Sequence, residues 1–207
     1  MKKFFLVLTI SWLLTLVGSS LVLATNKITI SYDMAGEYGM YHDFFHQHKH
    51  KHTPNDVDPG FAIGYECTHK VRRVEFGGGL ETQLNRSLSQ NKDSEFRFTQ
   101  LYGVIYVNFK NEGNILPFFV GRLGYNTHTG NDVFKNEVYG SDPELGNGIY
   151  YAVGFGLHSE HNMLAILYSI NHSNHTMNTT IESDGSTKTS PHDANYEKIS
   201  LVYGLKF

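Results

Sequence analysis

Residues 149–157 read Ile-Tyr-Tyr-Ala-Val-Gly-Phe-Gly-Leu. Every second position, from Ile149 to Leu157, holds a large apolar or aromatic side chain, whereas Ala152, Gly154 and Gly156 lie between them. Successive side chains of a β-strand point to opposite faces. The pattern therefore predicts a strand with one bulky apolar face and one face of mostly small residues.

The same period of two recurs along the chain and predicts eight strands. Their predicted ranges are 28–41, 61–69, 73–84, 95–109, 115–126, 149–157, 164–171 and 198–207. The segment 95–109 carries apolar residues on both faces, so its orientation stays open, and a β-bulge within it would explain the pattern. Aromatic residues make up 14% of the chain and Gly occurs 20 times, which also favours an all-β protein.

The connections between these segments alternate between short and long. Tight turns are expected at 69–72, 110–114 and 158–162. Long polar loops are expected at 42–59, 86–94, 127–147 and 173–195. Short turns at one end and long loops at the other, with an even number of strands, are typical of an antiparallel up-and-down transmembrane β-barrel.

The two faces of the strands differ in charge. The bulky face is nearly free of charge, whereas acids and glycines share the other face. A charged Lys or Arg at mid-depth on a lipid-facing surface costs about 2–4 kcal/mol, so the bulky face is expected to meet lipid. A soluble lipocalin-like barrel, which hides its apolar face inside, is the inverted alternative.

The polar network expected in the lumen consists of Asp33, Glu37, Glu66, Glu75, Glu81, Arg122 and Lys198. We expect these residues to hold the lumen together rather than to form a proton or cation path, because eight strands enclose only enough space for side chains.

The last strand ends on an aromatic residue. Tyr203, Leu205 and Phe207 alternate on the apolar face, which resembles the terminal signal that the barrel assembly machinery reads in outer-membrane barrels. The segments 116–125 and 150–157 resemble glycine-and-aromatic strands of the small bacterial outer-membrane β-barrel family, both OmpA-like and opacity-protein-like. The resemblance covers about residues 26–207. It implies an eight-stranded monomer in the bacterial cell outer membrane, in contact with outer-membrane lipid.

The N-terminus has the features of a signal peptide. Lys2 and Lys3 precede an apolar run, and Val22 and Ala24 suit cleavage after Ala24. The sequence thus predicts a cleaved segment 1–24 and a barrel domain 25–207, and an uncleaved helical anchor is the alternative. The formal net charge of -3 disfavours a nucleic-acid partner. The single Cys67 rules out a disulfide scaffold.

A histidine-rich tract stands out in the first long loop. Alternate histidines on an extended chain point the same way, so several imidazoles could reach one Zn²⁺, Cu²⁺ or Ni²⁺ ion. The candidate ligands are His46, His48, His50 and His52, with Asp43 and Asp56 as additional oxygen donors. A solvated loop with adventitious metal binding, and an adhesive loop whose charge depends on pH, are the alternatives. No other cofactor is expected.

A second candidate site is the segment Asn171–His175. It is similar to the His-x-Ser-Asn segment of outer-membrane lipid A deacylases, with Glu182 as a loose third member. Here Ser173 follows His172 directly, so on a strand the two side chains face opposite ways. We therefore expect a non-enzymatic role in surface structure, adhesion or contact with a host or surface ligand. The loops 42–59, 127–147 and 173–195 would make these contacts, and a lipid A-modifying hydrolase is the alternative.

Overall fold

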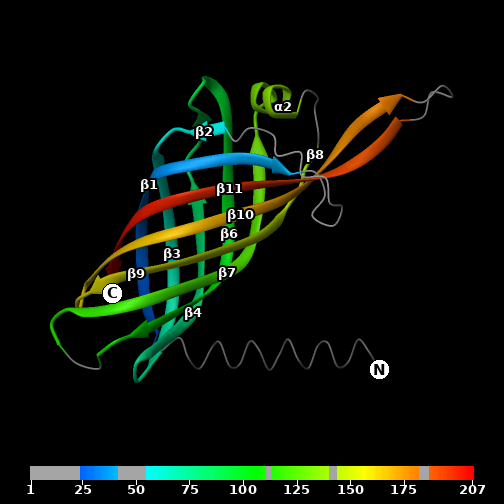
Figure 1. The fold of residues 1–207 in the computed structure, drawn as a ribbon. Helices are drawn as coiled ribbons and strands as arrows, with labels where there is room; N and C mark the ends of the chain where they lie inside the picture. The colour runs from blue at the N-terminus through cyan, green and yellow to red at the C-terminus, as the bar shows by residue number, and fades with distance from the viewer. Residues whose placement is uncertain (1–23, 42–54, 111–112, 140–143, 182–186) are drawn as a thin grey trace, which may run out of the picture.

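Eight long antiparallel strands form a closed ring (Figure 1). The computed structural model describes residues 24–41, 55–110, 113–139, 144–181 and 187–207. In order around the ring, the strands are β1 (Thr25–Tyr41), β3 (Gly60–Val71), β4 (Val74–Gln83), β6 (Asn91–Asn108), β7 (Leu116–Gly130), β9 (Gly148–His158), β10 (Asn162–Ile181) and β11 (Thr187–Lys206). The ring closes because β11 pairs with β1 along the register from Lys27↔Lys206 to Tyr41↔Asp193.

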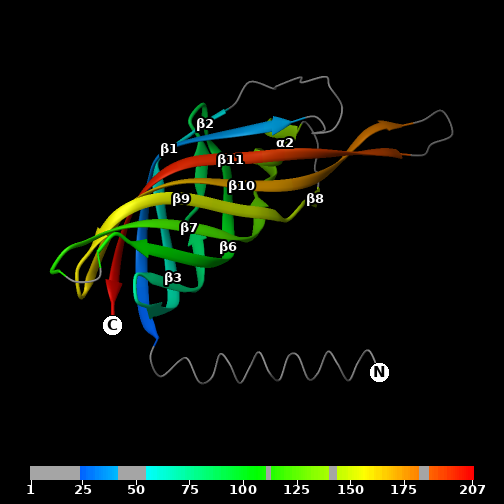
Figure 2. The same ribbon diagram turned by 60° about the horizontal axis from the view of Figure 1, so that its bottom comes forward.

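Short turns gather at one end of the ring. Only Arg72 and Arg73 separate β3 from β4, and Arg72 adopts a left-handed conformation with φ of 57°. Residues 159–161 separate β9 from β10. Asn26 and Phe207 exchange backbone hydrogen bonds of 3.1 and 2.9 Å, so the start of β1 and the end of β11 lie at this end too (Figures 1 and 2). We call it the turn end.

The opposite end, called the loop end below, contains more regular structure than the sequence predicts. The expected loop 127–147 includes the end of β7, the helix α2 (Asp132–Tyr139) and the short strand β8 (Glu144–Leu145). The short strands β2 (Asn55–Val57) and β5 (Arg86–Leu88) lie in two other expected loops. Most of the expected loop 173–195 belongs to a β10–β11 hairpin, which extends beyond the ring (Figures 1 and 2).

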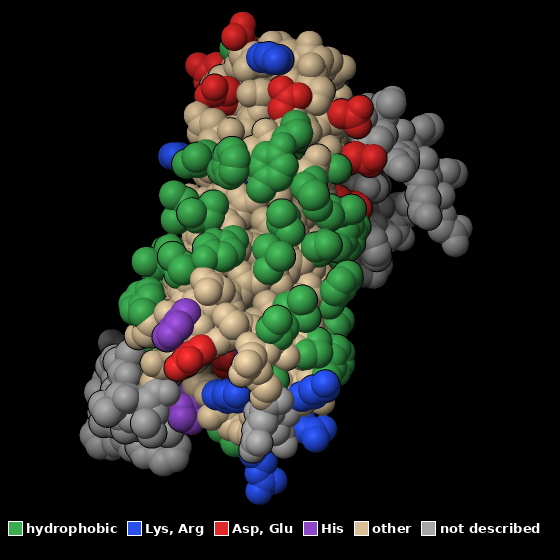
Figure 3. All heavy atoms as spheres, turned by 90° about the vertical axis from the view of Figure 1, so that its left-hand side faces the viewer, with side chains coloured by type: hydrophobic (Ala, Val, Ile, Leu, Met, Phe, Trp, Pro, Cys, Tyr) green, Lys and Arg blue, Asp and Glu red, His purple; other side chains and the backbone are tan. Residues whose placement is uncertain are grey.

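The bulky apolar face of the strands points outward. Phe61, Leu80 and Phe155 are 51%, 50% and 62% exposed, whereas Glu66 and Glu81 on the other face are buried. Figure 3 shows a band of hydrophobic side chains on one side of the ring, with Asp and Glu gathered at one end and Lys and Arg at the other. The inverted, lipocalin-like arrangement is therefore wrong, and the expected antiparallel β-barrel with its bulky face outward is confirmed.

A β-bulge in β1 corrects the predicted faces of this strand. The register with β11 shifts between Asp33 and Ala35, so one extra residue is inserted there. Beyond the bulge Glu37 is exposed and Tyr38 is fully buried, the reverse of the strict period of two. The prediction that Glu37 belongs to the lumen is therefore wrong.

The structure settles the orientation of β6, which the sequence left open for residues 95–109. Its burial alternates without interruption from Ser94 to Asn108, and its pairing with β4 and β7 shows no register shift. A bulge is therefore not the explanation of the apolar residues on both faces. Apolar residues occur on both faces because the inner side chains Phe96, Phe98 and Tyr102 contribute to apolar clusters inside the ring. No helix in the described ranges is long and apolar enough to cross a bilayer.

Candidate functional site

Eight charged side chains are buried inside the ring, each at most 4% exposed. They are Lys27, Asp33, Glu66, Glu75, Glu81, Arg86, Arg122 and Lys198. Four are acids and four are bases, so the two signs balance. A buried charge is tolerated when a partner and hydrogen bonds replace the water it has lost. We call this set the lumen network.

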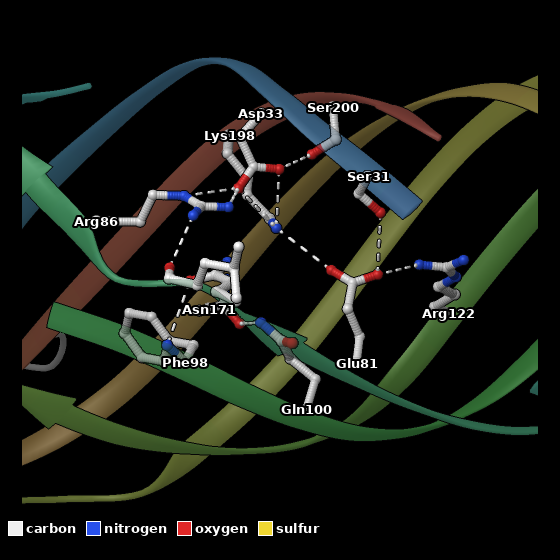
Figure 4. Close-up of polar contacts among 12 residues, drawn as sticks. Ser31, Asp33, Glu81, Arg86, Phe98, Gln100, Arg122, Asn171, Lys198 and Ser200 are labelled. Atoms are coloured by element: carbon white, nitrogen blue, oxygen red, sulfur yellow. Dashed lines mark hydrogen bonds and ion pairs between the residues drawn. The ribbon is translucent and has the colours of Figure 1, made fainter. Parts of the chain in front are cut away.

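Asp33 is the centre of the half of the network nearer the loop end (Figure 4). Arg86 of β5 donates to its Oδ2 from Nη2 at 2.6 Å and from Nε at 3.1 Å. Lys198 of β11 approaches Oδ1 to 3.2 Å, and the Ser200 hydroxyl donates to the same oxygen at 2.6 Å. The Asp33 carboxylate thus satisfies both of its oxygens within the protein.

Glu66 of β3 is the centre of the half nearer the turn end. Arg122 of β7 donates to its Oε1 from Nη2 at 2.7 Å, and Tyr102 donates to the same oxygen at 3.1 Å. Tyr106 donates to Oε2 at 2.5 Å. The Lys27 ammonium lies 3.8 Å from Oε2, 3.8 Å from the centre of the Tyr106 ring, and in direct contact with Glu75.

Glu81 of β4 joins the two halves. Its Oε2 accepts from Arg122 Nη1 at 3.1 Å, and its Oε1 lies 3.4 Å from Lys198 Nζ (Figure 4). The eight groups form one chain in which positive and negative charges alternate. Its order is Arg86, Asp33, Lys198, Glu81, Arg122, Glu66, Lys27 and Glu75.

The structure brings together all but one of the residues that the sequence placed in the lumen, Glu37 being the exception explained by the bulge. Sequence reasoning missed Lys27 and Arg86. Lys27 lies one residue before the predicted strand, yet it has the same parity as Thr29, Ser31 and Asp33, and this parity could have identified it. Arg86 falls in a predicted loop, and no local pattern points it inward.

Small residues make room for the network. A Cβ atom built on Gly79 would lie 2.8 Å from the Tyr102 ring and 2.9 Å from Glu66 Cγ. Contacts this short are repulsive, so any larger side chain at position 79 would displace two members or partners of the network. The glycines on the inner face thus reflect lack of space.

An aromatic cluster fills the ring toward the loop end. Phe98 stacks on His128 with ring centroids 4.2 Å apart, and its ring is also parallel to that of Tyr196, 5.9 Å away. Phe134 of α2 is fully buried against Phe96, with centroids 4.9 Å apart. The helix α2 therefore packs its apolar side onto this cluster, which we call the loop-end cluster.

Two further contacts fix α2 in this position. The Asn131 side chain accepts a hydrogen bond from the Phe134 backbone N–H at 2.8 Å, which caps the start of the helix. The Tyr139 and Tyr38 hydroxyls lie 2.5 Å apart. Burial raises the pKa of the Tyr139 phenol well above its ordinary value, so this side chain is neutral at pH 7. The lumen is thus filled by charged pairs in its middle and by rings toward the loop end.

The residues of the predicted assembly signal lie at the turn end of the closing strand. Tyr203, Leu205 and Phe207 are 43%, 48% and 68% exposed and point outward. In the register with β1, Leu205 lies opposite Ile28 and Tyr203 opposite Ile30. This part of β11 therefore continues the outward apolar surface, and its recognition by an assembly machinery stays a prediction.

Solved structures with a similar arrangement are outer-membrane proteins. Neisserial surface protein A has a TM-score of 0.50 and 12% identity, over 88% of this chain and 97% of that chain. OprG from Pseudomonas aeruginosa has a TM-score of 0.50 and 14% identity, over 88% and 96%. The chain has the fold of the small eight-stranded outer-membrane β-barrels.

A third such barrel is Ail, the attachment invasion locus protein of Yersinia pestis, with a TM-score of 0.46 and 10% identity over 89% of this chain and 99% of that chain. No family model and no curated protein matches the sequence. At these identities the likeness shows the fold alone.

The candidate hydrolytic pair of the barrel is not assembled. Ser173 is fully buried on the inner face of β10, whereas neighbouring His172 lies half-buried on the other face. The His172 ring nitrogen Nδ1 is 2.7 Å from Asn195 Oδ1, and Nε2 is 4.0 Å from Asp193. His172 therefore cannot take the proton of Ser173 in this arrangement. Glu182 lies outside the described residues.

The predicted metal ligands are not placed by the structure. His46, His48, His50, His52 and Asp43 lie outside the described residues, and Asp56 is exposed on β2. Within the described residues no group of three or more His, Cys, Asp or Glu side chains could hold a metal ion. Binding of Zn²⁺, Cu²⁺ or Ni²⁺ at the tract stays a prediction.

Proposed function

We propose that this chain is a bacterial outer-membrane protein with a non-enzymatic role in contacts at the cell surface. The outward apolar surface supports a place in a bilayer, because such a surface is stable in contact with lipid and not with water. The fold, shared with outer-membrane proteins, supports the same location. Monomeric assembly fits this proposal, since the ring closes within one chain.

The β10–β11 hairpin is the observation that carries the surface role. Pairing of β1 with β11 ends at Tyr41↔Asp193, and β8 pairs with β10 only at His175 and Thr176. The pairing between β10 and β11 nevertheless continues to Ile181↔Thr187. This length is not needed to close a ring whose lumen is already filled in its middle and toward the loop end, so it is available for contact with a surface ligand (Figures 1 and 2).

The location is tested by heat-dependent migration on gels. The cell-envelope fraction is extracted with detergent and run in SDS with and without boiling. We expect the unboiled protein to migrate as a compact band that shifts on boiling, because a closed ring of strands resists SDS until heated. Release of the protein from cells without detergent would contradict the location.

The surface role is tested by shortening the hairpin. In the test variant residues 177–190 are replaced by Asn-Gly, which suits a two-residue hairpin turn, next to the Thr176↔Pro191 pair. We expect cells that display this variant to lose most of the adhesion to cultured epithelial cells that the wild type confers. Lys110→Ala, an exposed change at the turn end, is the matched control and retains adhesion.

Both variants are first checked for the heat-dependent gel shift, so that loss of folding is not mistaken for loss of contact. If the folded, shortened variant adheres as well as the wild type, the hairpin is not the contact surface. If wild-type protein adds no adhesion to the cells at all, the proposed role in adhesion fails.

A further inference from the structure

A cavity of about 500 Å³ lies at the turn end of the ring. Side chains from several strand ends and turns line it, including Lys70, Glu75, His158, Ser159, His161 and Lys206. Volumes of about 300–1,000 Å³ are typical of sites for small molecules. Glu75 and His158 are buried whereas Lys70 and Glu160 are exposed, so the cavity reaches from the inner side of the ring to the surface at the turn end.

The cavity is lined by two lysines and two glutamates. Within the described part of the chain, neither Lys70 nor Lys206 forms an ion pair with an acidic group at 4.0 Å or less. Glu75 is already in contact with Lys27 and with the Thr68 hydroxyl. Glu160 is 88% exposed and lies 3.9 Å from His161. Lys206 contacts only neutral groups, His158 Nδ1 at 2.7 Å and the Ser159 carbonyl at 3.4 Å, so neither lysine has its charge paired within the described residues.

His158 adds a hydrogen-bond donor beside them. Lys206 Nζ donates to His158 Nδ1 at 2.7 Å, so the neutral ring carries its proton on Nε2. This Nε2 is buried and has no hydrogen-bond partner among the described residues. A buried donor without an acceptor is unfavourable, so an oxygen acceptor that reaches it from the cavity would be stabilising. Ser159 and Asn114 line the same cavity and add neutral polar groups.

We propose that this cavity binds the phosphate group of a small solute that enters from the turn side of the membrane. Two ammonium groups suit phosphate, because lysine binds it as a point charge and each ammonium has several donors. The cavity is lined from the inner face of the ring, whereas acyl chains lie outside the ring. A free solute therefore fits better than a lipid headgroup.

The test measures binding of inorganic phosphate to the folded barrel in nanodiscs of phosphatidylcholine, by calorimetric titration. We expect saturable binding by the wild type and at least tenfold weaker binding by the Lys70→Gln/Lys206→Gln double variant. Lys110→Gln is the matched control, because Lys110 is exposed at the same end and does not line the cavity. Its affinity should equal that of the wild type.

The single variant Lys70→Gln is measured as well, because Lys70 is exposed and its substitution is expected to leave the ring folded. We expect this variant to bind phosphate severalfold more weakly than the wild type. Titration in nanodiscs of anionic phosphatidylglycerol separates the two sources of phosphate. Unchanged affinity there supports a free solute, and loss of binding shows that lipid phosphate occupies the same cavity. The proposal is overturned if the wild type binds no phosphate saturably, or if the lysine variants bind it as well as the control.

Discussion

Val153→Lys is expected to lower the free energy of unfolding in a lipid bilayer by about 2–4 kcal/mol, the cost of a basic side chain at mid-depth on the lipid face of a barrel. Val153 is the middle one of five outward side chains on β9 and is 51% exposed. In a water-soluble barrel an exposed Val→Lys change would have almost no effect. The size of the decrease in the free energy of unfolding therefore shows whether this face meets lipid or water.

The measurement is urea unfolding of the barrel in phospholipid vesicles, followed by the gel shift. Fluorescence of tryptophan is no probe here, because the only Trp of the chain is Trp12 in the predicted signal peptide. Ile149→Lys, at the loop-end side of the same strand, is the matched control and should cost about 0–1 kcal/mol, as expected near the interface. Equal small losses at both positions would show that Val153 does not meet hydrocarbon.

The outward face could be predicted from sequence because all its residues share one environment. Phe61, Leu80 and Phe155 come from different strands, yet each meets the same apolar surroundings, so the period of two continues from strand to strand. The inner face is less regular. It holds charged pairs in the middle and rings toward the loop end, and this is why β6 looks apolar on both sides.

The errors of sequence reasoning have two physical causes. One inserted residue in β1 moves every later side chain of this strand to the opposite face. Nothing in the local sequence around Met34 distinguishes this bulge from a regular strand. Beyond the ring, the sequence of the β10–β11 hairpin is mostly polar. Its polar residues therefore show no alternation of hydrophobicity, and the segment was predicted to be a loop.

The lumen network could be predicted in composition but not in connectivity. Parity along each strand places Glu66, Glu81 and Arg122 on one face, and opposite charges in a small space must pair. Which acid contacts which base depends on how strands distant in sequence are staggered around the ring. Arg86 reaches Asp33 from a short strand that no periodicity reveals.

Arg122→Met is expected to destabilise the folded barrel by about 3–5 kcal/mol, the usual cost of removing one partner of a buried ion pair. Arg122 is buried and donates to both Glu66 at 2.7 Å and Glu81 at 3.1 Å. Without the Arg122 guanidinium, the carboxylates of Glu66 and Glu81 both lose a positive partner inside the ring and repel each other. Urea unfolding in vesicles measures the loss. Arg97 is exposed, and its Nε donates to the Thr129 hydroxyl at 3.2 Å; Arg97→Met should change stability by less than about 0.5 kcal/mol.

A second variant separates charge balance from lost packing. Arg122→Met/Glu81→Gln leaves three acids and three bases in the lumen network, and Lys198 keeps its contact with Asp33 at 3.2 Å. If unpaired charge causes the loss, the double variant is more stable than Arg122→Met alone, although it lacks one more ionic group. If the double variant is the less stable of the two, the guanidinium acts mainly by packing over the Tyr102 ring, 4.7 Å away, and the alternation of charge is not what stabilises the closed lumen.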